Sequence, residues 1–256
     1  MDGEVTAIDE FPWMALLEYK NITAEKSVGF GCSGTLISKR HVLTTAHCIK
    51  ELEQRKLELF SVRLGEYNIS SEEDCVEMFG FRDCTDPPQD IAVEKWFVYA
   101  KHNKHIHDVA LIQLKENAQY NDFVRPICLP STNDTEEVGQ ILVIAGWGRT
   151  EKENMSPVKL KVNVPVVSFT DCYEKYRIAN TILNQTQHLC AGSVLGKDAC
   201  SGDSGGPLMT LRKTDGRWIV MGIISTGNSC GLPDWPGIYM RVAYYREWIY
   251  GHIKNK

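Results

Sequence analysis

The chain has 256 residues, and its 28 basic and 33 acidic side chains leave a net charge of −5 with histidine neutral. Hydrophobic residues make up 43% of the chain and charged residues 24%, which is ordinary globular composition. This balance argues against a disordered tail, a collagen repeat and a basic surface for nucleic acid. No apolar run approaches the roughly 20 residues of a membrane-spanning helix, so we expect neither nucleic acid nor a membrane as a partner.

Short apolar or alternating runs recur about every ten to fifteen residues between turn-forming clusters, which predicts an all-β fold. The clearest predicted strands cover 33–38, 108–114, 141–145 and 218–224. Residues 72–88 are predicted to form an exposed loop pinned by its cysteines, and 125–137 to form a linker between two β halves. From Ala243 onward, apolar side chains recur at helical spacing as far as Ile253, so a helix is predicted to close the chain.

Cysteine usage indicates the compartment. The nine cysteines stand at 32, 48, 75, 84, 128, 172, 190, 200 and 230. None forms a Cys-x-x-Cys pair, so a zinc cluster is not expected, and the wide spacings favour disulfides in an oxidising compartment. The odd count leaves one thiol to pair with another chain or with a missing segment.

Other signals bear on the same question. The acidic start, Met1-Asp2-Gly3-Glu4, lacks the pattern of a secretory signal and by itself leaves open a cytosolic protein or a processed chain. Five glycosylation sequons, however, agree with an extracellular protein. They begin at Asn21, Asn68, Asn133, Asn154 and Asn184.

Three separated segments carry the residues of a nucleophilic site. They are Leu43-Thr-Thr-Ala-His-Cys48, His107-Asp-Val-Ala-Leu-Ile112 and Asp198-Ala-Cys-Ser-Gly-Asp-Ser-Gly-Gly-Pro-Leu208. A serine hydroxyl becomes a good nucleophile when a neighbouring base removes its proton, and histidine does so near neutral pH when an acid fixes its tautomer. Glycines beside the serine let backbone N–H groups face an oxyanion. Each segment alone has a structural explanation, but all three in the order His, Asp, Ser favour a catalytic triad.

On these residues the chain resembles the trypsin-like serine peptidases over essentially its whole length. Further matching elements are Phe11-Pro-Trp13, Gly146-Trp-Gly148, Pro236-Gly-Ile-Tyr239 and the terminal helix. The resemblance implies an all-β fold of two antiparallel six-stranded β-barrels packed across an active-site cleft, with a C-terminal α-helix. The barrels would cover about 11–124 and 140–242, joined by a linker at about 125–139, with the helix at about 243–254.

The resemblance also implies roles for the residues of the three segments. His47 would be the general base and acid, Asp108 its orienting partner and Ser204 the nucleophile. The backbone amides of Gly202 and Ser204 would form the oxyanion hole.

The resemblance further implies a specificity pocket. Asp198 matches the acid at the base of the trypsin-type pocket, where a buried carboxylate selects a cationic side chain, although it could instead pair only with a loop. Ala199 lacks the hydroxyl that many relatives place there, so we expect cleavage after Arg more readily than after the shorter Lys. The other predicted substrate-binding residues are Ser225, Gly227, Gly237 and His105. Thr226 stands where relatives usually carry Trp, so one aromatic wall beyond the primary pocket is expected to be missing.

A second departure from the family concerns the start of the chain. The family's mature chain begins with Ile, whose ammonium pairs with the aspartate before the serine, here Asp203. Counting back from Phe11-Pro-Trp13, Met1 falls at the family's second position, and one residue spans at most about 3.6 Å. We therefore expect that the Met1 ammonium does not reach Asp203 and that the chain as written resembles an inactive precursor.

The cysteines narrow the resemblance. Cys32–Cys48, Cys172–Cys190 and Cys200–Cys230 fit the bridges common to trypsin-like enzymes. An extra pair, Cys75–Cys84, resembles the clip-domain proteases of arthropods, of the easter and prophenoloxidase-activating type. In that family Cys128 would tie the peptidase domain to a light chain that carries the clip domain. The alternative is a digestive trypsin with a spurious cysteine pair.

A metal site is also implied. Glu66, Asn68, Ser71 and Asp74 resemble the calcium loop of these proteases, and carboxylates with loop carbonyls suit calcium. A solvated acidic loop is the alternative, and Glu73 would replace Asp74 in another register. Zinc at His102, His105 and His107 is rejected, because His107 adjoins Asp108 and relatives use no zinc there.

The sequence thus predicts a secreted, zymogen-derived serine endopeptidase of a haemolymph-like fluid. It would act by limited proteolysis on a downstream zymogen or a cytokine-like precursor in Toll or prophenoloxidase activation, with a serpin-type inhibitor. The rival from another class is a non-catalytic protease homologue that acts as a binding cofactor, but such homologues commonly replace the serine and Ser204 is present.

Overall fold

The computed structural model describes residues 3–50, 52–78, 80–103 and 106–254. Its strands are β1 (Glu4–Val5), β2 (Met14–Asn21), β3 (Lys26–Ser38), β4 (His41–Thr44), β5 (Leu57–Leu64), β6 (Cys75–Met78), β7 (Phe81–Cys84), β8 (Gln89–Val98), β9 (Ala110–Leu114), β10 (Ile141–Gly146), β11 (Leu160–Pro165), β12 (His188–Gly192), β13 (Pro207–Leu211), β14 (Trp218–Thr226) and β15 (Pro236–Arg241). The helices are α1 (His47–Lys50), a 3-10 turn (Glu53–Arg55), α2 (Phe169–Ile178) and α3 (Val242–Ile253). The predicted all-β fold with a terminal helix is confirmed.

The first half is a closed antiparallel barrel with the strand order β2-β3-β4-β9-β8-β5. Every residue of β4 and β9 is buried, including the polar His41, Thr44 and Gln113, so neither strand has a face exposed to solvent. Val42 of β4 pairs with Leu36 of β3 on one side and with Ile112 of β9 on the other. This rigid core fixes the two chain segments that leave β4 and enter β9.

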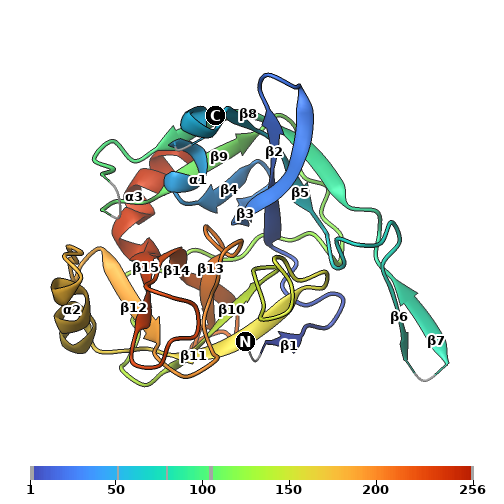
Figure 1. The fold of residues 1–256 in the computed structure, drawn as a ribbon. Helices are drawn as coiled ribbons and strands as arrows, with labels where there is room; N and C mark the ends of the chain where they lie inside the picture. Colours follow the sequence, from blue (N-terminus) through green and yellow to red (C-terminus); the bar gives the residue numbers. More distant parts are fainter. Residues whose placement is uncertain (1–2, 51, 79, 104–105, 255–256) are drawn as a thin grey trace.

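The second half is a curled sheet of seven strands, in the order β1-β11-β10-β13-β14-β15-β12. It departs from the predicted six-stranded barrel because β1, from the start of the chain, joins its edge through Val5 and Leu160. An isolated bridge between Val166, just after β11, and Ala191 of β12 brings the two ends of the curled sheet together, so that it resembles an incomplete barrel. The two halves lie one above the other in Figure 1.

Two helices flank this sheet. The terminal helix, predicted at 243–254, is α3, and it buries Val242, Tyr245 and Ile249. Helix α2 was not predicted. It begins after Ser168, whose hydroxyl caps it by accepting the Asp171 backbone N–H.

The predicted cysteine-pinned loop contains a separate two-stranded hairpin, β6–β7. Cys75 faces Cys84 at its base, where the two residues form a disulfide. Figure 1 shows this hairpin extending away from both halves of the molecule. No helix in the described part of the chain is long and apolar enough to cross a membrane.

Candidate active site

The predicted triad residues lie where the two halves meet. His47 begins α1, three residues after β4 ends at Thr44, and Asp108 lies two residues before β9 begins. Ser204 lies in the turn before β13 in the other half. Its carbonyl oxygen accepts the Ser33 backbone N–H of the barrel at 2.8 Å, so the two halves are joined beside the site.

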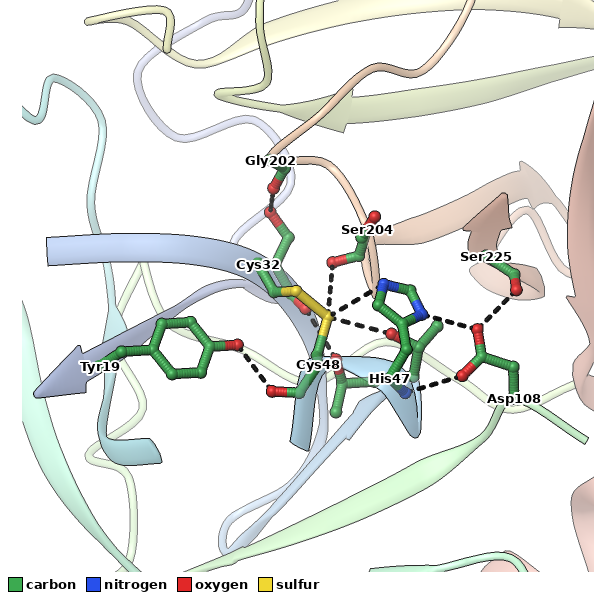
Figure 2. The surroundings of a disulfide bond; sticks show 11 residues. Tyr19, Cys32, His47, Cys48, Asp108, Gly202, Ser204 and Ser225 are labelled. Atoms are coloured by element: carbon green, nitrogen blue, oxygen red, sulfur yellow. Dashed lines mark hydrogen bonds and ion pairs between the residues drawn. A yellow bond between two sulfur atoms is a disulfide. The ribbon is translucent and has the colours of Figure 1, made fainter. Parts of the chain in front are cut away.

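Asp108 holds His47 by two hydrogen bonds. Asp108 Oδ2 lies 2.7 Å from His47 Nδ1, and Oδ1 accepts the His47 backbone N–H at 2.9 Å. The Ser225 hydroxyl donates to Oδ2 at 2.6 Å. Figure 2 shows the imidazole between Asp108 and Ser204. The arrangement orients the ring and supplies a negative charge to its Nδ1 side.

The charge of Asp108 is maintained although the side chain is only 1% exposed. Burial by itself raises the pKa of this carboxyl, but the hydrogen bonds and charge of His47, together with the Ser225 hydroxyl, bring the pKa below its ordinary value. Asp108 is therefore ionised at neutral pH and stabilises a protonated His47.

The glycines next to Ser204 allow the backbone of its turn to adopt conformations and close contacts that a side chain would prevent. Gly205 has a φ of 84°, and a Cβ there would collide with the Thr44 hydroxyl and the Ser33 carbonyl. The Cys32–Cys48 disulfide packs beneath, with the Cys48 sulfur 3.6 Å from His47 Nε2 and 3.7 Å from the Ser204 carbonyl oxygen (Figure 2). The close approach of the two halves thus requires glycine at this position.

The proposed oxyanion hole has two donors to offer. The Gly202 carbonyl accepts the Ser33 hydroxyl at 3.0 Å. The backbone N–H groups of Gly202 and Ser204, however, take part in no hydrogen bond within the described residues. Two unpaired donors beside a serine hydroxyl suit a developing negative charge.

The predicted specificity residues enclose a cavity of about 260 Å³ next to Ser204. Asp198 lies within it and accepts the backbone N–H groups of Ala199, at 2.8 Å, and Gly231, at 3.2 Å. Burial raises the pKa of Asp198 to about 6, although these hydrogen bonds lower it. No cation pairs with this carboxylate within the described residues, so the cavity offers an anionic end to a ligand.

The walls of the cavity include the predicted Ser225, Gly227 and Gly237, together with Thr226. A Cβ on Gly237 would lie 2.9 Å from the Tyr239 hydroxyl and 3.2 Å from Asp198 Oδ1. A side chain at this position would therefore narrow the cavity. His105 lies outside the described residues.

Tyr239 is a lining residue that sequence reasoning missed. It is 1% exposed, and its buried hydroxyl has no hydrogen-bond partner in the described part of the chain. Alternate residues of a strand share a face, so Gly237 on β15 already indicated that Tyr239 faces the same cavity. Ser225 was predicted only as a substrate-binding residue, but its side chain also contacts Asp108.

Asp203, the residue before Ser204, is buried, with 8% of its surface exposed. Its carboxylate accepts the backbone N–H groups of Gly148, at 2.8 Å, and Cys200, at 2.9 Å. Burial raises the pKa of Asp203 to about 6 against the effect of these two bonds. Gly146 and Gly148 have no room for a Cβ against this carboxylate. Met1, whose ammonium was predicted not to reach Asp203, lies outside the described residues.

The predicted calcium residues lie in one loop, in which Glu66 and Asp74 are buried, Asn68 is half-buried and Ser71 is exposed. Asp74 accepts the Ser71 hydroxyl at 2.6 Å and the backbone N–H groups of Tyr67 and Asn68. Glu66 is also buried, and burial, followed by the charge of Asp74, raises its pKa. Asn68 joins through its backbone, because its side chain accepts the Ser70 N–H. Glu73, the alternative ligand, is exposed and pairs with Arg82.

The four predicted disulfides are present, and Cys128 is a free, half-buried thiol. The bridges are Cys32–Cys48, Cys75–Cys84, Cys172–Cys190 and Cys200–Cys230. Among the sequons, Asn133, Asn154 and Asn184 are exposed, and Asn21 and Asn68 are half-buried.

Comparison with known proteins agrees with this geometry. Residues 1–249 match the family model described as Trypsin. The chain is 44% identical to CLIP domain-containing serine protease B9 of Anopheles gambiae and 41% identical to phenoloxidase-activating enzyme 1 of Spodoptera litura, in each case over 99% of its length. It spans 63% and 66% of the length of these two relatives.

A solved structure agrees in fold. The crystal structure of the Drosophila Grass clip serine protease of the Toll pathway superposes with a TM-score of 0.84 at 33% identity, covering 99% of this chain and 72% of that one. The chain therefore belongs to the trypsin family of serine proteases, among the peptidase domains of the clip-domain proteases.

Proposed function

We propose that this chain is the peptidase domain of a secreted, zymogen-derived endopeptidase that cuts after Arg, and less readily after Lys, in an extracellular immune or developmental cascade. The observation that carries the proposal is the hydrogen bond between the buried Asp108 and the half-buried His47 beside Ser204, next to a cavity that contains Asp198. The likeness to proteases named for phenoloxidase activation and the Toll pathway supports the cascade role.

Acylation would begin at Ser204. His47 takes the proton of the Ser204 hydroxyl as the oxygen attacks the scissile carbonyl carbon, and Asp108 stabilises the resulting imidazolium. The Gly202 and Ser204 N–H groups receive the negative charge on the carbonyl oxygen. His47 then gives its proton to the departing amine.

Deacylation repeats the same sequence with water. His47 removes a proton from a water molecule, which attacks the ester, and the proton returns to Ser204 when the acid product leaves. The dual role requires an imidazole whose tautomer is fixed, which supports the assignment of Asp108 as the orienting partner.

Selectivity would come from Asp198. An arginine guanidinium can form two parallel hydrogen bonds with a carboxylate. The lysine side chain is shorter, and its ammonium group depends on additional acceptors. Ala199, next to Asp198, supplies no hydroxyl. The preference for Arg should therefore come from the pair Asp198 and Ala199.

The test is hydrolysis of matched Arg, Lys and Phe peptide amides by the proteolytically activated protein. We expect fast cleavage after Arg, slower cleavage after Lys and negligible cleavage after Phe. Ser204→Ala should lower kcat by about 10⁴-fold or more, and Ala199→Ser should raise the Lys-to-Arg ratio of kcat/KM. Folded, activated protein that cleaves none of them would instead favour the non-catalytic homologue that acts as a binding cofactor.

We further propose that Cys128 joins a light chain carrying a clip domain. Its thiol is half-buried, and its backbone is held by hydrogen bonds to Trp218 and Val220 of β14. The substrate would be a downstream zymogen or cytokine-like precursor in a haemolymph-like fluid. The inhibitor would be a serpin. The exposed sequons would carry glycans. Cys128→Ser should separate the two chains on a non-reducing gel.

We also infer a structural calcium ion at the loop of Glu66 and Asp74. Arg63 pairs with Glu66 at 3.2 Å and so offsets one of the two buried carboxylates, and the Asp74 carboxylate has no cation among the described side chains. Oxygen donors of this kind suit Ca²⁺. Glu66 and Asp74 would hold the ion, with Ser71 beside them and carbonyl groups of the loop. The ion would supply positive charge that stabilises the folded loop.

Thermal unfolding tests the calcium inference. An ion that binds only the folded chain adds about 2.7 kcal/mol at 100 times its Kd, so excess Ca²⁺ should raise Tm relative to a chelator. Asp74→Asn should abolish this response, whereas Glu73→Gln, on the exposed side of the loop, should retain it. Equal responses in wild type and Asp74→Asn would place any bound calcium elsewhere.

A further inference from the structure

His107, the residue before Asp108, is held in an unusual backbone conformation. Its φ is 53°, in the left-handed region that non-glycine residues seldom occupy and keep only where their surroundings fix them. Its carbonyl accepts the Val109 N–H at 2.8 Å, which closes a tight turn around Asp108. The direction in which the chain presents the Asp108 carboxylate thus depends on what holds His107.

Two tyrosines hold the His107 ring, and we call this group the aromatic clasp: Tyr99, His107 and Tyr245. His107 is 6% exposed, and its Nδ1 lies 3.1 Å from the Tyr245 hydroxyl. Its ring stacks on Tyr99, with centroids 4.8 Å apart and planes at 24°. Tyr99 also meets the edge of Tyr245 at 5.2 Å. Because Tyr245 belongs to α3, the clasp joins the terminal helix to the turn that carries Asp108.

The clasp acts by position and not by charge. Burial, followed by the positive charges of Lys101, His188 and His102, lowers the pKa of His107, so its ring is neutral at pH 7. Burial likewise raises the pKa of Tyr245, which keeps its hydroxyl neutral. The polar contacts of the Asp108 carboxylate are made by His47 and Ser225. No member of the clasp needs to touch substrate or the reacting atoms.

We propose that His107 is a positioning residue, held by Tyr245 and Tyr99, that sets the Asp108 carboxylate against Nδ1 of His47. The assignment rests on the proposed peptidase function. A carboxylate displaced from Nδ1 stabilises the imidazolium less, so the pKa of His47 falls and proton transfer slows. The cavity with Asp198 lies in the other half of the molecule, so binding of the cationic side chain is unaffected.

The first test compares two substitutions on α3. Tyr245→Phe removes the hydroxyl that meets His107. Tyr244→Phe, the matched control, removes a hydroxyl from a 43% exposed neighbour whose ring is 6.0 Å from His107. Since a misplacement of about 1 Å costs up to roughly 100-fold, we expect Tyr245→Phe to lower kcat about three- to tenfold. KM for a small Arg amide should be unchanged, and Tyr244→Phe should resemble wild type.

Substitutions of His107 extend the test. His107→Ala removes the ring and strains the left-handed backbone, and should lower kcat about ten- to hundredfold. His107→Asn keeps a residue that tolerates this conformation and should recover part of the loss. In each affected variant the acid limb of kcat/KM should move to lower pH, because His47 then binds its proton more weakly.

A second measurement does not require activity. In the Ser204→Ala background, NMR titration should give a lower pKa for His47 with Tyr245→Phe than with Tyr244→Phe. Variants that lose only Tm, with kcat, the acid limb and the His47 pKa equal to the control, would overturn the assignment. Wild-type protein that hydrolyses no peptide amide would contradict the proposed function, while the titration would still decide the role of the clasp.

Discussion

The half-buried Asp198 carboxylate must be charged if it is to bind a cationic side chain as proposed above. Its pKa of about 6 means that it is ionised at neutral pH and becomes neutral as the pH falls through 6. A neutral carboxyl no longer attracts a guanidinium. The acidity of the medium should therefore govern how well the cavity holds a cation.

We expect the Kd of a small aryl amidine to rise as the pH falls below about 6, by roughly tenfold per pH unit. Titration calorimetry between pH 5 and 8 measures this, in the Ser204→Ala variant. An uncharged aryl ligand of the same shape is the control, because protonation of His47 would affect both ligands. Parallel pH profiles for the two ligands would contradict the role of Asp198.

Individual residues also show what could be predicted from the sequence and what could not. His47, Asp108 and Ser204 were predicted because each lies in a distinctive short segment, and the structure places all three where the two halves meet. Tyr239 was missed although it lies two residues from Gly237 on the same strand, and the pairing of β14 with β15 is what turns this face towards the cavity. The φ of His107 is likewise a property of its packing and has no sequence signal of its own.

At the scale of elements, the buried ammonium of Lys159 lowers the stability of the fold. This residue, just before β11, is 4% exposed, and its ammonium lies about 6 Å from the ring centroids of Tyr67 and Trp147 without an ion pair in the described chain. Burial lowers the pKa of Lys159 to about 8, although the charges of Glu10, Asp9, Glu66 and Asp74 raise it. The folded chain thus binds this proton more weakly than the unfolded chain.

Lys159→Met should therefore stabilise the fold at pH 7, by about 1–3 kcal/mol. In wild type, the contribution of Lys159 should increase the free energy of unfolding as the pH rises from 8 towards 10.5, where only the unfolded chain keeps the proton. Urea unfolding at pH 7 and 10 measures both effects, and the difference between wild type and variant should shrink at pH 10.

Lys161→Met serves as the control for this substitution. Lys161 is partly exposed and pairs with Glu10 at 2.8 Å, so its loss should change stability little and in the opposite direction. A Lys159 variant less stable than wild type at pH 7 would show that packing of the aliphatic stem on the two rings outweighs the buried charge.

Elements were predicted where their apolar pattern was strong. The terminal helix repeats apolar residues at helical spacing, whereas α2 buries only Cys172 and Tyr176 among its ten residues. The available signal for α2 was its cap, Ser168 followed by Asp171, which precedes little hydrophobic sequence. The seven-stranded sheet could not be predicted because β1 consists of two exposed residues whose pairing is decided by a distant strand.

At the scale of the whole molecule, the two halves have different duties. The first barrel positions His47 and Asp108 through β4 and β9, and the second sheet positions Ser204 and Asp198. The predicted division into two halves came from the resemblance to a family, because the sequence pattern alone indicates many strands but not how they close. The contacts that join the halves, such as Ser33 with Ser204 and Ser225 with Asp108, require the fold.

None of the four disulfides of the described chain links the two halves. Cys32–Cys48 and Cys75–Cys84 lie in the first half, and Cys172–Cys190 and Cys200–Cys230 lie in the second. Apart from the linker and residues 6–13, which lead from β1 to the barrel, only non-covalent contacts join the two halves. The enzyme should therefore lend itself to fragment complementation. A break in the exposed stretch around Asn133 should leave the peptidase active, and denaturing, non-reducing chromatography should then separate two inactive pieces that recover hydrolysis only when refolded together. Pieces that each hydrolyse peptide amides alone would contradict this expectation.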